Sequence, residues 1–250
     1  MNIADIPIEK MPRHIAIILD GNGRWAKKNG KLRSQGHKAG ADRIEVIGDA
    51  MIELGIPYLT VYAFSTENWK RSEEEVSYLM GLMRQYLMKN KKDALRKGIR
   101  IRVIGDRSRL DDRLQELIGE MERDTATMQN LNLTFAINYG GRDEILRAVR
   151  KIAKDAVEGV IIPESISETQ FAAYLDTAAL PDPDLLIRTS AEKRLSNFLL
   201  WQIAYSELYF SDKLWPDFTP EDLRAAITDY AGRERRYGGR KETETKEKSQ

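Results

Sequence analysis

Five arginines stand in polar stretches that follow short apolar runs along the chain. They are Arg24, Arg33, Arg71, Arg188 and Arg194. A guanidinium fork pairs well with phosphate oxygens, and Gly21 and Gly23 let backbone amides approach an anion closely. Asp20 lies among these groups, where its carboxylate would repel a phosphate unless a hard cation stood between them. The set predicts a diphosphate site bridged by magnesium, although a single arginine of this kind is equally well explained as a surface salt bridge.

The apolar runs before these polar stretches are predicted to be parallel β-strands. Five are assigned to His14–Leu19, Tyr58–Phe64, Ile99–Ile104, Leu131–Ile137 and Asp184–Ile187, with a sixth at Ser206–Phe210. Helical patterns separate them, which is typical of one α/β domain with a mostly parallel sheet of about six strands flanked by helices. Because the carboxyl ends of parallel strands share an edge, five polar segments are expected to face a single cleft. These segments are Asp20–Ala26, Ser65–Arg71, Gly105–Arg109, Asn138–Glu144 and Arg188–Asn197.

The helices between the strands carry recognisable ends. An apolar stripe over 44–54 predicts one helix, which Gly55 terminates. Ser72 and Glu75 form a capping box for a long helix that ends at Gly98, and Glu73–Glu75 are interpreted as a solvated acidic first turn. Further helices are expected at about 110–128, about 142–157, after Ser167 and from Thr219.

Composition excludes several classes of protein. The 250 residues carry 40 basic and 39 acidic side chains, so the net charge of +1 does not indicate a nucleic-acid partner. The absence of cysteine excludes disulfides, thiolate zinc sites and cysteine nucleophiles. The sequence shows no secretion signal and no apolar run of the roughly 18 residues that a membrane span needs, so a cytoplasmic protein is expected.

A nicotinamide-dependent oxidoreductase is an alternative interpretation of the first polar segment. Gly21, Gly23 and Ala26 match the dinucleotide pattern G-x-G-x-x-A directly after a strand. The acid that should bind the ribose at the end of the second strand is missing, because Phe64 and Ser65 stand there. This hypothesis therefore ranks below the diphosphate site.

Long motifs in the chain resemble those of the cis-prenyltransferases, and most closely those of bacterial undecaprenyl diphosphate synthases. They are DGNGRWA at Asp20, the segment from Arg33 to His37, YAFSTENWKR at Tyr62, NYGGR at Asn138 and LLIRTSAEKRLSNFLLWQIAYSELYF at Leu185. The resemblance runs over residues 11–239, which are taken as the catalytic domain. Residues 1–10 would form an N-terminal extension, and residues 240–250 lack apolar side chains and are expected to be a disordered tail.

The resemblance implies condensation of isopentenyl diphosphate in cis onto an allylic diphosphate, with farnesyl diphosphate as the expected starter and Mg²⁺ as the cofactor. A medium-chain product such as undecaprenyl diphosphate, for the lipid carrier of cell-wall synthesis, is expected. Residues implied for the allylic diphosphate are Gly21, Asn22, Gly23, Arg24, Arg33 and His37, and those implied for isopentenyl diphosphate are Arg71, Arg188, Arg194 and Ser196. The metal would be held by Asp20 and Glu207.

Other residues of the same motifs are expected near the reacting groups. Ser65 and Asn68 match positions close to the departing proton, and because a neutral amide is a poor base, Asn68 is interpreted as orienting substrate. Thr66, Glu67 and Leu195 are further candidate substrate contacts. Trp25 and Trp69 are interpreted either as walls of the isoprenoid site or as core aromatics.

The growing chain needs a hydrophobic tunnel, for which the apolar face of Val76–Met88 beside Ile137 and Leu131 is a candidate wall. Leu131 matches the position that limits product length in the family. The resemblance also implies a homodimer in which the RYG triplet at 236–238 serves the neighbouring subunit. Release of the apolar product by transient contact with a membrane surface is expected.

Two residues depart from the pattern of the family. Ala191 stands where glycine is usual, inside the arginine-containing loop, and Glu144 stands where aspartate is usual. If position 191 requires a positive φ, the methyl group would cost about 1 kcal/mol or more and weaken binding of isopentenyl diphosphate.

Overall fold

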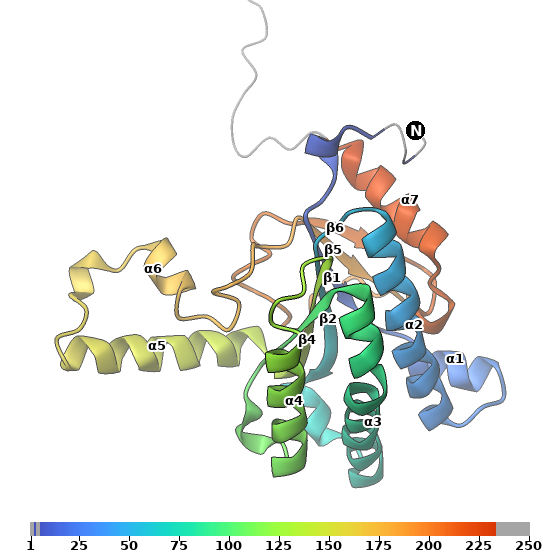
Figure 1. The fold of residues 1–250 in the computed structure, drawn as a ribbon, viewed down its shortest axis with the longest axis horizontal. Helices are drawn as coiled ribbons and strands as arrows, with labels where there is room; N and C mark the ends of the chain where they lie inside the picture. The colour runs from blue at the N-terminus through green and yellow to red at the C-terminus, as the bar shows by residue number, and fades with distance from the viewer. Residues whose placement is uncertain (1–2, 4–5, 234–250) are drawn as a thin grey trace, which may run out of the picture.

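The computed structural model describes residue 3 and residues 6–233, and its centre is a six-stranded sheet (Figure 1). The strands are β1 His14–Ile18, β2 Tyr58–Ser65, β3 Ile99–Ile104, β4 Leu131–Tyr139, β5 Leu185–Arg188 and β6 Glu207–Phe210. Their order is β3-β4-β2-β1-β5-β6, and every neighbouring pair is parallel. The predicted single α/β domain and its six strands are confirmed, with strand ends that differ from the predicted ones by one or two residues.

The strands form because alternate side chains find a core on each face of the sheet. All five residues of β1 are buried. Ile15 and Ile17 belong to the larger core, whereas Ala16 and Ile18 belong to a second one, as the two-residue period of a strand requires. Such burial on both faces is what a nearly continuous apolar run encodes in a parallel sheet.

Seven helices accompany the sheet in the described part of the chain. They are α1 Asn22–Lys28, α2 Arg33–Glu53, α3 Glu73–Lys97, α4 Asp112–Asp124, α5 Gly141–Val157, α6 Glu168–Ala172 and α7 Pro220–Ala231. Ser72, Ser167 and Thr219 cap their helices with side-chain oxygens, as predicted. Helix α3 ends at Gly98, whose φ of 70° suits glycine. Helix α4 is shorter than the predicted 110–128 because Asp111 caps it at the start.

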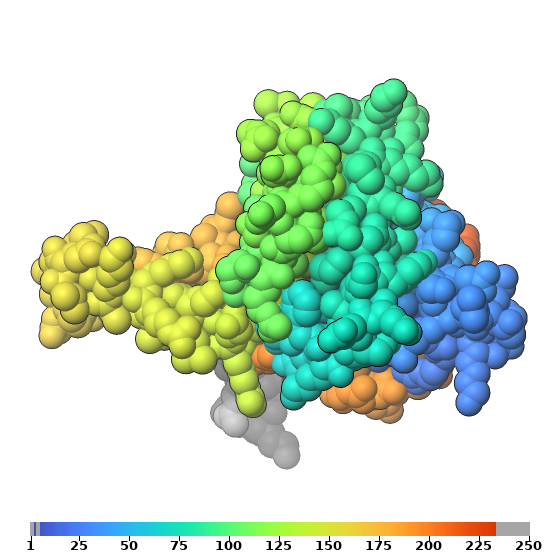
Figure 2. All heavy atoms as spheres, turned by 90° about the horizontal axis from the view of Figure 1, so that it is seen from below, coloured from blue at the N-terminus to red at the C-terminus, as the bar shows by residue number. Residues whose placement is uncertain are grey.

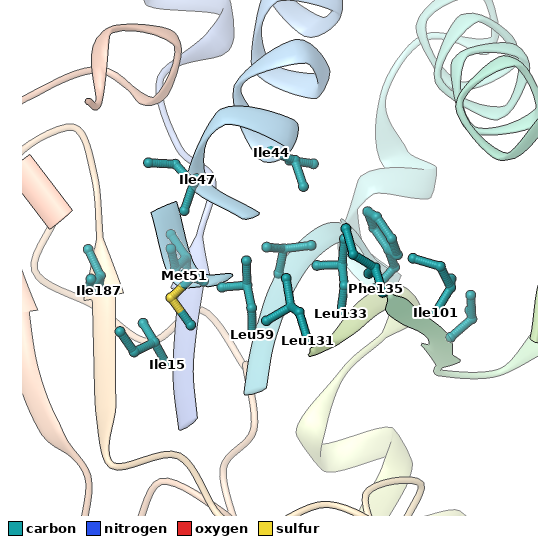
Figure 3. Close-up of a cluster of buried hydrophobic side chains, with 14 of the residues drawn as sticks. Ile15, Ile44, Ile47, Met51, Leu59, Ile101, Leu131, Leu133, Phe135 and Ile187 are labelled. Atoms are coloured by element: carbon teal, nitrogen blue, oxygen red, sulfur yellow. The ribbon is translucent and has the colours of Figure 1, made fainter. Parts of the chain in front are cut away.

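The two faces of the sheet are covered in different ways. Residues of α2, α3, α4 and α7 pack on one face and form the larger core with side chains of β1, β2 and β4 (Figure 3). The other face is covered mainly by the segment 195–203, through Phe198, Leu199 and Ile203, which is not helical. The expected parallel sheet flanked by helices is therefore confirmed, and the second face is covered mainly by a non-helical segment.

Helix α5 and the short α6 extend away from the sheet as an arm (Figures 1 and 2). Apolar side chains on this arm are exposed, among them Leu146, Val149 and Val157. None of the helices in the described range has the length and apolar character that crossing a membrane requires. The expected tail at 240–250 and the RYG triplet at 236–238 lie outside the described residues.

Candidate active site

A cavity of about 630 Å³ opens at the carboxyl ends of β1, β2 and β5. Fourteen of the predicted site residues line it: Asp20, Gly21, Asn22, Gly23, Arg24, Arg33, His37, Ser65, Glu67, Asn68, Arg71, Arg188, Arg194 and Ser196. They come from segments more than 160 residues apart in the sequence. The parallel sheet brings them together because the ends of its strands share an edge.

Only three of the five predicted polar segments reach this cavity. The segments after β3 and β4 do not line the cavity, and residues of both contact the Trp69 side chain. Asn138 Oδ1 accepts a hydrogen bond from Trp69 Nε1 at 2.7 Å, and the Arg109 guanidinium lies 4.5 Å from the centre of the indole ring. The expectation that all five segments line one cleft is therefore wrong, because the segments after β3 and β4 contact Trp69, which does not itself line the cavity.

Asp20 lies at the centre of the cationic part of the cavity. Its Oδ2 accepts a hydrogen bond from Arg188 Nη2 at 2.9 Å, and Arg24 Nη2 lies 3.4 Å from Oδ1. The Arg188 side chain is only 3% exposed and also donates to Ser196 Oγ at 2.7 Å. Arg188 Nε and Ser190 Oγ are buried polar atoms without a hydrogen-bond partner. Asp20, Arg24 and Arg188 therefore form one ion-pair network in the cationic part of the cavity.

Gly21 is needed at the turn from β1 into α1. Its φ is 109°, and a Cβ atom at this position would lie 2.5 Å from Ser190 Oγ. Both the backbone conformation and the close approach of the Arg188 loop therefore favour glycine here.

Glu75 contacts two arginines and one histidine of the predicted site, although it was not itself predicted as a site residue. Its Oε1 lies 3.2 Å from Arg33 Nε, 3.2 Å from His37 Nε2 and 2.8 Å from Arg71 Nη1. The Glu75 side chain is 13% exposed, so the interpretation of 73–75 as a uniformly solvated turn is wrong for this residue. Burial lowers the pKa of His37, and the hydrogen bond to Glu75 opposes that shift. The predicted capping box is therefore only half formed: Ser72 Oγ accepts the Glu75 N–H, but the Glu75 carboxylate turns inward to these three side chains. The S-x-x-E pattern gave no indication of this direction.

Glu192 plays a similar part on the opposite side of Asp20. One carboxylate oxygen lies 3.1 Å from Arg24 Nη2, and the other pairs with Arg194. All five arginines of the site thus lie against a carboxylate of the protein. An anion that entered the cavity would replace these carboxylates as the partner of the arginines.

Ser65 and Asn68 are locked in a capping arrangement at the end of β2. The Ser65 backbone N–H donates to Asn68 Oδ1 at 3.0 Å. Tyr62 and Asn197, which the sequence analysis left out, also line the cavity. Tyr62 Oη donates to the Tyr139 carbonyl at 3.0 Å, and Asn197 Nδ2 donates to Glu67 Oε1 at 3.0 Å. Both residues lie inside motifs identified in the sequence, and this position could have indicated that they belong to the site.

Five predicted site residues do not line the cavity: Trp25, Thr66, Trp69, Leu195 and Glu207. Trp25 Nε1 donates to Asp217 Oδ1 at 2.7 Å, and Leu195 packs on the second core. Glu207 is paired in register with Leu185, at the amino end of β5, and its carboxylate lies 2.7 Å from Arg233 Nη1. Glu207 therefore lies at the opposite end of the sheet from the Asp20 site.

The donor set suits magnesium held mainly by a substrate. No group of three or more histidine or acidic side chains that could hold a metal is found among the described residues. One carboxylate, Asp20, beside a cavity rich in arginine fits Mg²⁺, which keeps several waters and binds through one or two carboxylates and phosphate oxygens.

The two residues that depart from the family pattern, Ala191 and Glu144, have different surroundings. Ala191 has a φ of 58°, so the predicted strain at this position is present. Glu144 is 1% exposed, and its carboxylate accepts hydrogen bonds from Tyr139 Oη at 2.6 Å, Gln202 Nε2 at 3.0 Å and the Asp176 N–H at 2.9 Å. Burial raises the pKa of Glu144. The Glu144 carboxylate therefore links α5 to the end of β4, to Gln202 and to the backbone at Asp176.

An apolar cavity of about 100 Å³ adjoins the polar one. The two share a wall made of Leu19, Asn22, His37, Tyr62, Ala63 and Leu79. Leu79, Met83 and Leu87 of α3 line it, as does Ile137, in accordance with the predicted tunnel wall. Leu131 is fully buried beside Gly48 and does not line this space.

Comparison with known proteins identifies the relatives of this chain. Residues 18–238 match the family model described as putative undecaprenyl diphosphate synthase. The isoprenyl transferase of Aquifex aeolicus is 51% identical over 92% of this chain and 96% of its own length, and that of Rhizobium meliloti is 50% identical over 92% and 93%.

Two solved structures share the fold. Lavandulyl diphosphate synthase from Lavandula x intermedia, in complex with dimethylallyl diphosphate, superposes with a TM-score of 0.90 at 39% identity, covering 92% of this chain and 99% of the other. A probable undecaprenyl diphosphate synthase from Campylobacter jejuni gives 0.76 at 34% identity, with coverage of 91% and 98%. These relatives do not favour the oxidoreductase alternative. The chain belongs to the undecaprenyl diphosphate synthase family of cis-prenyltransferases, and it is a prenyl-transferring enzyme.

Proposed function

We propose that this enzyme elongates farnesyl diphosphate with isopentenyl diphosphate units to a medium-chain cis-polyprenyl diphosphate such as undecaprenyl diphosphate, for a cell-wall lipid carrier. The observation that carries the proposal is the shared wall between the arginine-rich cavity and the apolar one. An allylic diphosphate has a highly charged head and a hydrocarbon tail, so it needs two such spaces in contact.

The residues divide the work according to where they lie. Gly21, Asn22, Gly23, Arg24, Arg33 and His37 would hold the allylic diphosphate, and Arg71, Arg188, Arg194 and Ser196 would hold isopentenyl diphosphate. Arginines at fixed positions stabilise charge that develops on the leaving diphosphate as its C–O bond breaks and the new C–C bond forms. Asn68, with its Oδ1 engaged by Ser65, would orient the second substrate, whose proton then leaves to a diphosphate oxygen.

Magnesium bound at Asp20 would supply charge neutralisation at the diphosphate. The Arg188 and Arg24 contacts keep the Asp20 carboxylate oriented toward the cavity. Glu207 is not placed to share that ion within one protomer, because it lies at the amino end of β6. We further propose that the enzyme acts as a homodimer and releases its product at a membrane surface.

The test is incorporation of radiolabelled isopentenyl diphosphate into farnesyl diphosphate, with and without magnesium, with products sized by chromatography. The wild type should give a magnesium-dependent ladder, and Asp20→Ala should lose at least about a hundredfold in rate because the metal site and the Arg188 contact are both removed. Asp42→Ala, which changes an exposed carboxylate paired with Lys38, is the matched control. A folded wild type that incorporates nothing would refute the proposal.

A further inference from the structure

The turn that carries Ser196 has a strained backbone where it lines the polar cavity. Ser196 and Asn197 have φ values of 50° and 64°, in the left-handed region that few residues other than glycine and asparagine adopt. Two such residues in succession persist only where the contacts around them determine the conformation. Both line the cavity, and Arg188 Nη1 donates to Ser196 Oγ at 2.7 Å. The contacts of this turn therefore decide where Ser196 meets a ligand.

Asn197 takes the place of an N-cap for helix α5. The residue at the start of the helix, Gly140, has no side chain that could accept a hydrogen bond. Instead, the Gly141 N–H donates to the Asn197 carbonyl at 2.7 Å, and the Arg142 N–H donates to Asn197 Oδ1 at 2.9 Å. A Cβ atom at Gly140 would lie 2.7 Å from Asn197 Nδ2, so glycine permits this close approach. Helix α5 thus begins against the turn.

The donor of the Asn197 side chain faces a different segment of the site. Its Nδ2 donates to Glu67 Oε1 at 3.0 Å, and Glu67 lies in the short 3₁₀ helix Thr66–Lys70, which carries Asn68 and leads to Arg71. Burial opposes the shift, but hydrogen bonds that include this one lower the pKa of Glu67, so its carboxylate is ionised at neutral pH. An amide suits both contacts at once, whereas a carboxylate could only accept. Asn197 therefore joins the segment after β5 to the segment after β2.

We propose that Asn197 is a positioning residue for isopentenyl diphosphate, because it holds Ser196 and Arg71 in one fixed arrangement. The inference rests on the proposed function, which assigns these two residues to that substrate. The carbonyl oxygen, the side-chain oxygen and the side-chain nitrogen of Asn197 are all hydrogen-bonded within the protein, so it acts through its neighbours. A diphosphate held by both segments binds more tightly when they are already aligned, since ordering them on binding would cost affinity.

The test reverses the polarity of the hydrogen bond between Asn197 and Glu67. Asn197→Asp keeps an acceptor for the Arg142 N–H but places a second carboxylate beside Glu67, so the two groups repel each other. This variant should raise the KM for isopentenyl diphosphate about tenfold and the KM for farnesyl diphosphate less than about threefold. Adding Glu67→Gln supplies an amide that donates to the new carboxylate. The double variant should therefore lower the KM for isopentenyl diphosphate at least about threefold from that of Asn197→Asp.

The matched control combines Asn197→Asp with Glu74→Gln. It has the same net charge as the double variant, but Glu74 is exposed on the first turn of α3 and does not line the cavity. The control should keep the raised KM for isopentenyl diphosphate. An unchanged KM in Asn197→Asp, no recovery with Glu67→Gln, or equal recovery in the control would overturn the inference.

Urea titration shows whether Asn197→Asp is folded. If it is not, Glu67→Ala breaks the same hydrogen bond without touching the contacts between Asn197 and α5. Glu67→Ala should then raise the KM for isopentenyl diphosphate more than Glu67→Gln does, because glutamine still offers an acceptor. Equal KM values for these two variants would contradict the role of Asn197.

Binding without turnover separates this inference from the proposed function. Calorimetry with isopentenyl diphosphate alone should show tighter binding by the wild type and the double variant than by Asn197→Asp and the control. A wild type that binds isopentenyl diphosphate but incorporates none refutes the activity alone, and the order of affinities still decides the role of Asn197. Equal affinities in all four proteins refute that role, and a wild type that does not bind isopentenyl diphosphate refutes both.

Discussion

At the scale of single residues, Glu75 contacts Arg33, His37 and Arg71, the side chains that we propose as ligands of the substrate diphosphates. Replacing it by glutamine removes the charge that competes for Arg33, His37 and Arg71. Glu75→Gln should therefore bind inorganic pyrophosphate about three- to tenfold more tightly at low salt, as measured by calorimetry. Glu74→Gln changes an exposed neighbour with the same charge and should have no such effect. Equal affinities in Glu75→Gln and the wild type would contradict this role of Glu75.

The backbone conformation of Ala191 predicts how its replacement would change stability. Its φ of 58° is unfavourable for any side chain, so Ala191→Gly should raise the free energy of unfolding by roughly 0.5–1 kcal/mol and tighten isopentenyl diphosphate binding. The control is Ala173→Gly, at an exposed helix end with a φ of −65°, which should lower stability instead. Urea titration measures both, and a destabilised Ala191→Gly protein would show that the methyl group is not strained.

At the scale of elements, Asp111 joins two helices that cover the sheet. Its Oδ1 caps α4 by accepting the Leu114 N–H at 3.0 Å, and its Oδ2 accepts a hydrogen bond from Arg84 of α3 at 2.5 Å. Asp111→Ala should lower the free energy of unfolding by about 1–2 kcal/mol, mostly through the lost cap. Asp112→Ala, one residue further on and equally exposed, should cost less than half as much in the same urea titration. Similar losses in both variants would exclude the cap as the cause.

At the scale of the whole molecule, His14 connects three strands at the end of the sheet opposite the active site. Its Nδ1 lies 2.6 Å from the Pro181 carbonyl before β5, and its Nε2 lies 2.8 Å from Thr60 Oγ1 of β2. Burial lowers the pKa of His14 to about 4, from 6.5 in an exposed histidine. The unfolded chain therefore binds this proton more readily than the folded one.

The sign of the pH dependence follows from that difference. Stability from His14 is complete above pH 6.5 and is lost as the pH falls from 6.5 to about 4, by about 3 kcal/mol in total. Free energies of unfolding measured between pH 4 and pH 7.5 should decline less steeply for His14→Asn than for the wild type. Parallel curves for the two proteins would assign the acid sensitivity to other groups.

Local sequence determined the elements and most of the chemistry. The strands at His14, Tyr58, Ile99 and Leu131 begin where the apolar runs begin, because burial in the sheet selects apolar side chains, even in the edge strand β3, where Arg100 and Arg102 alternate with buried isoleucines. Fourteen site residues were predictable because each lies directly after a strand or inside a motif, and parallel strands bring such positions to one edge.

Only the tertiary structure decided how side chains beyond those strand ends are directed. Glu75 turns inward and Glu207 lies at the far end of its strand, and no pattern in their neighbouring residues distinguishes these outcomes. Local periodicity specifies which face of an element is buried, whereas the partner that a buried side chain meets depends on contacts between residues far apart in the chain.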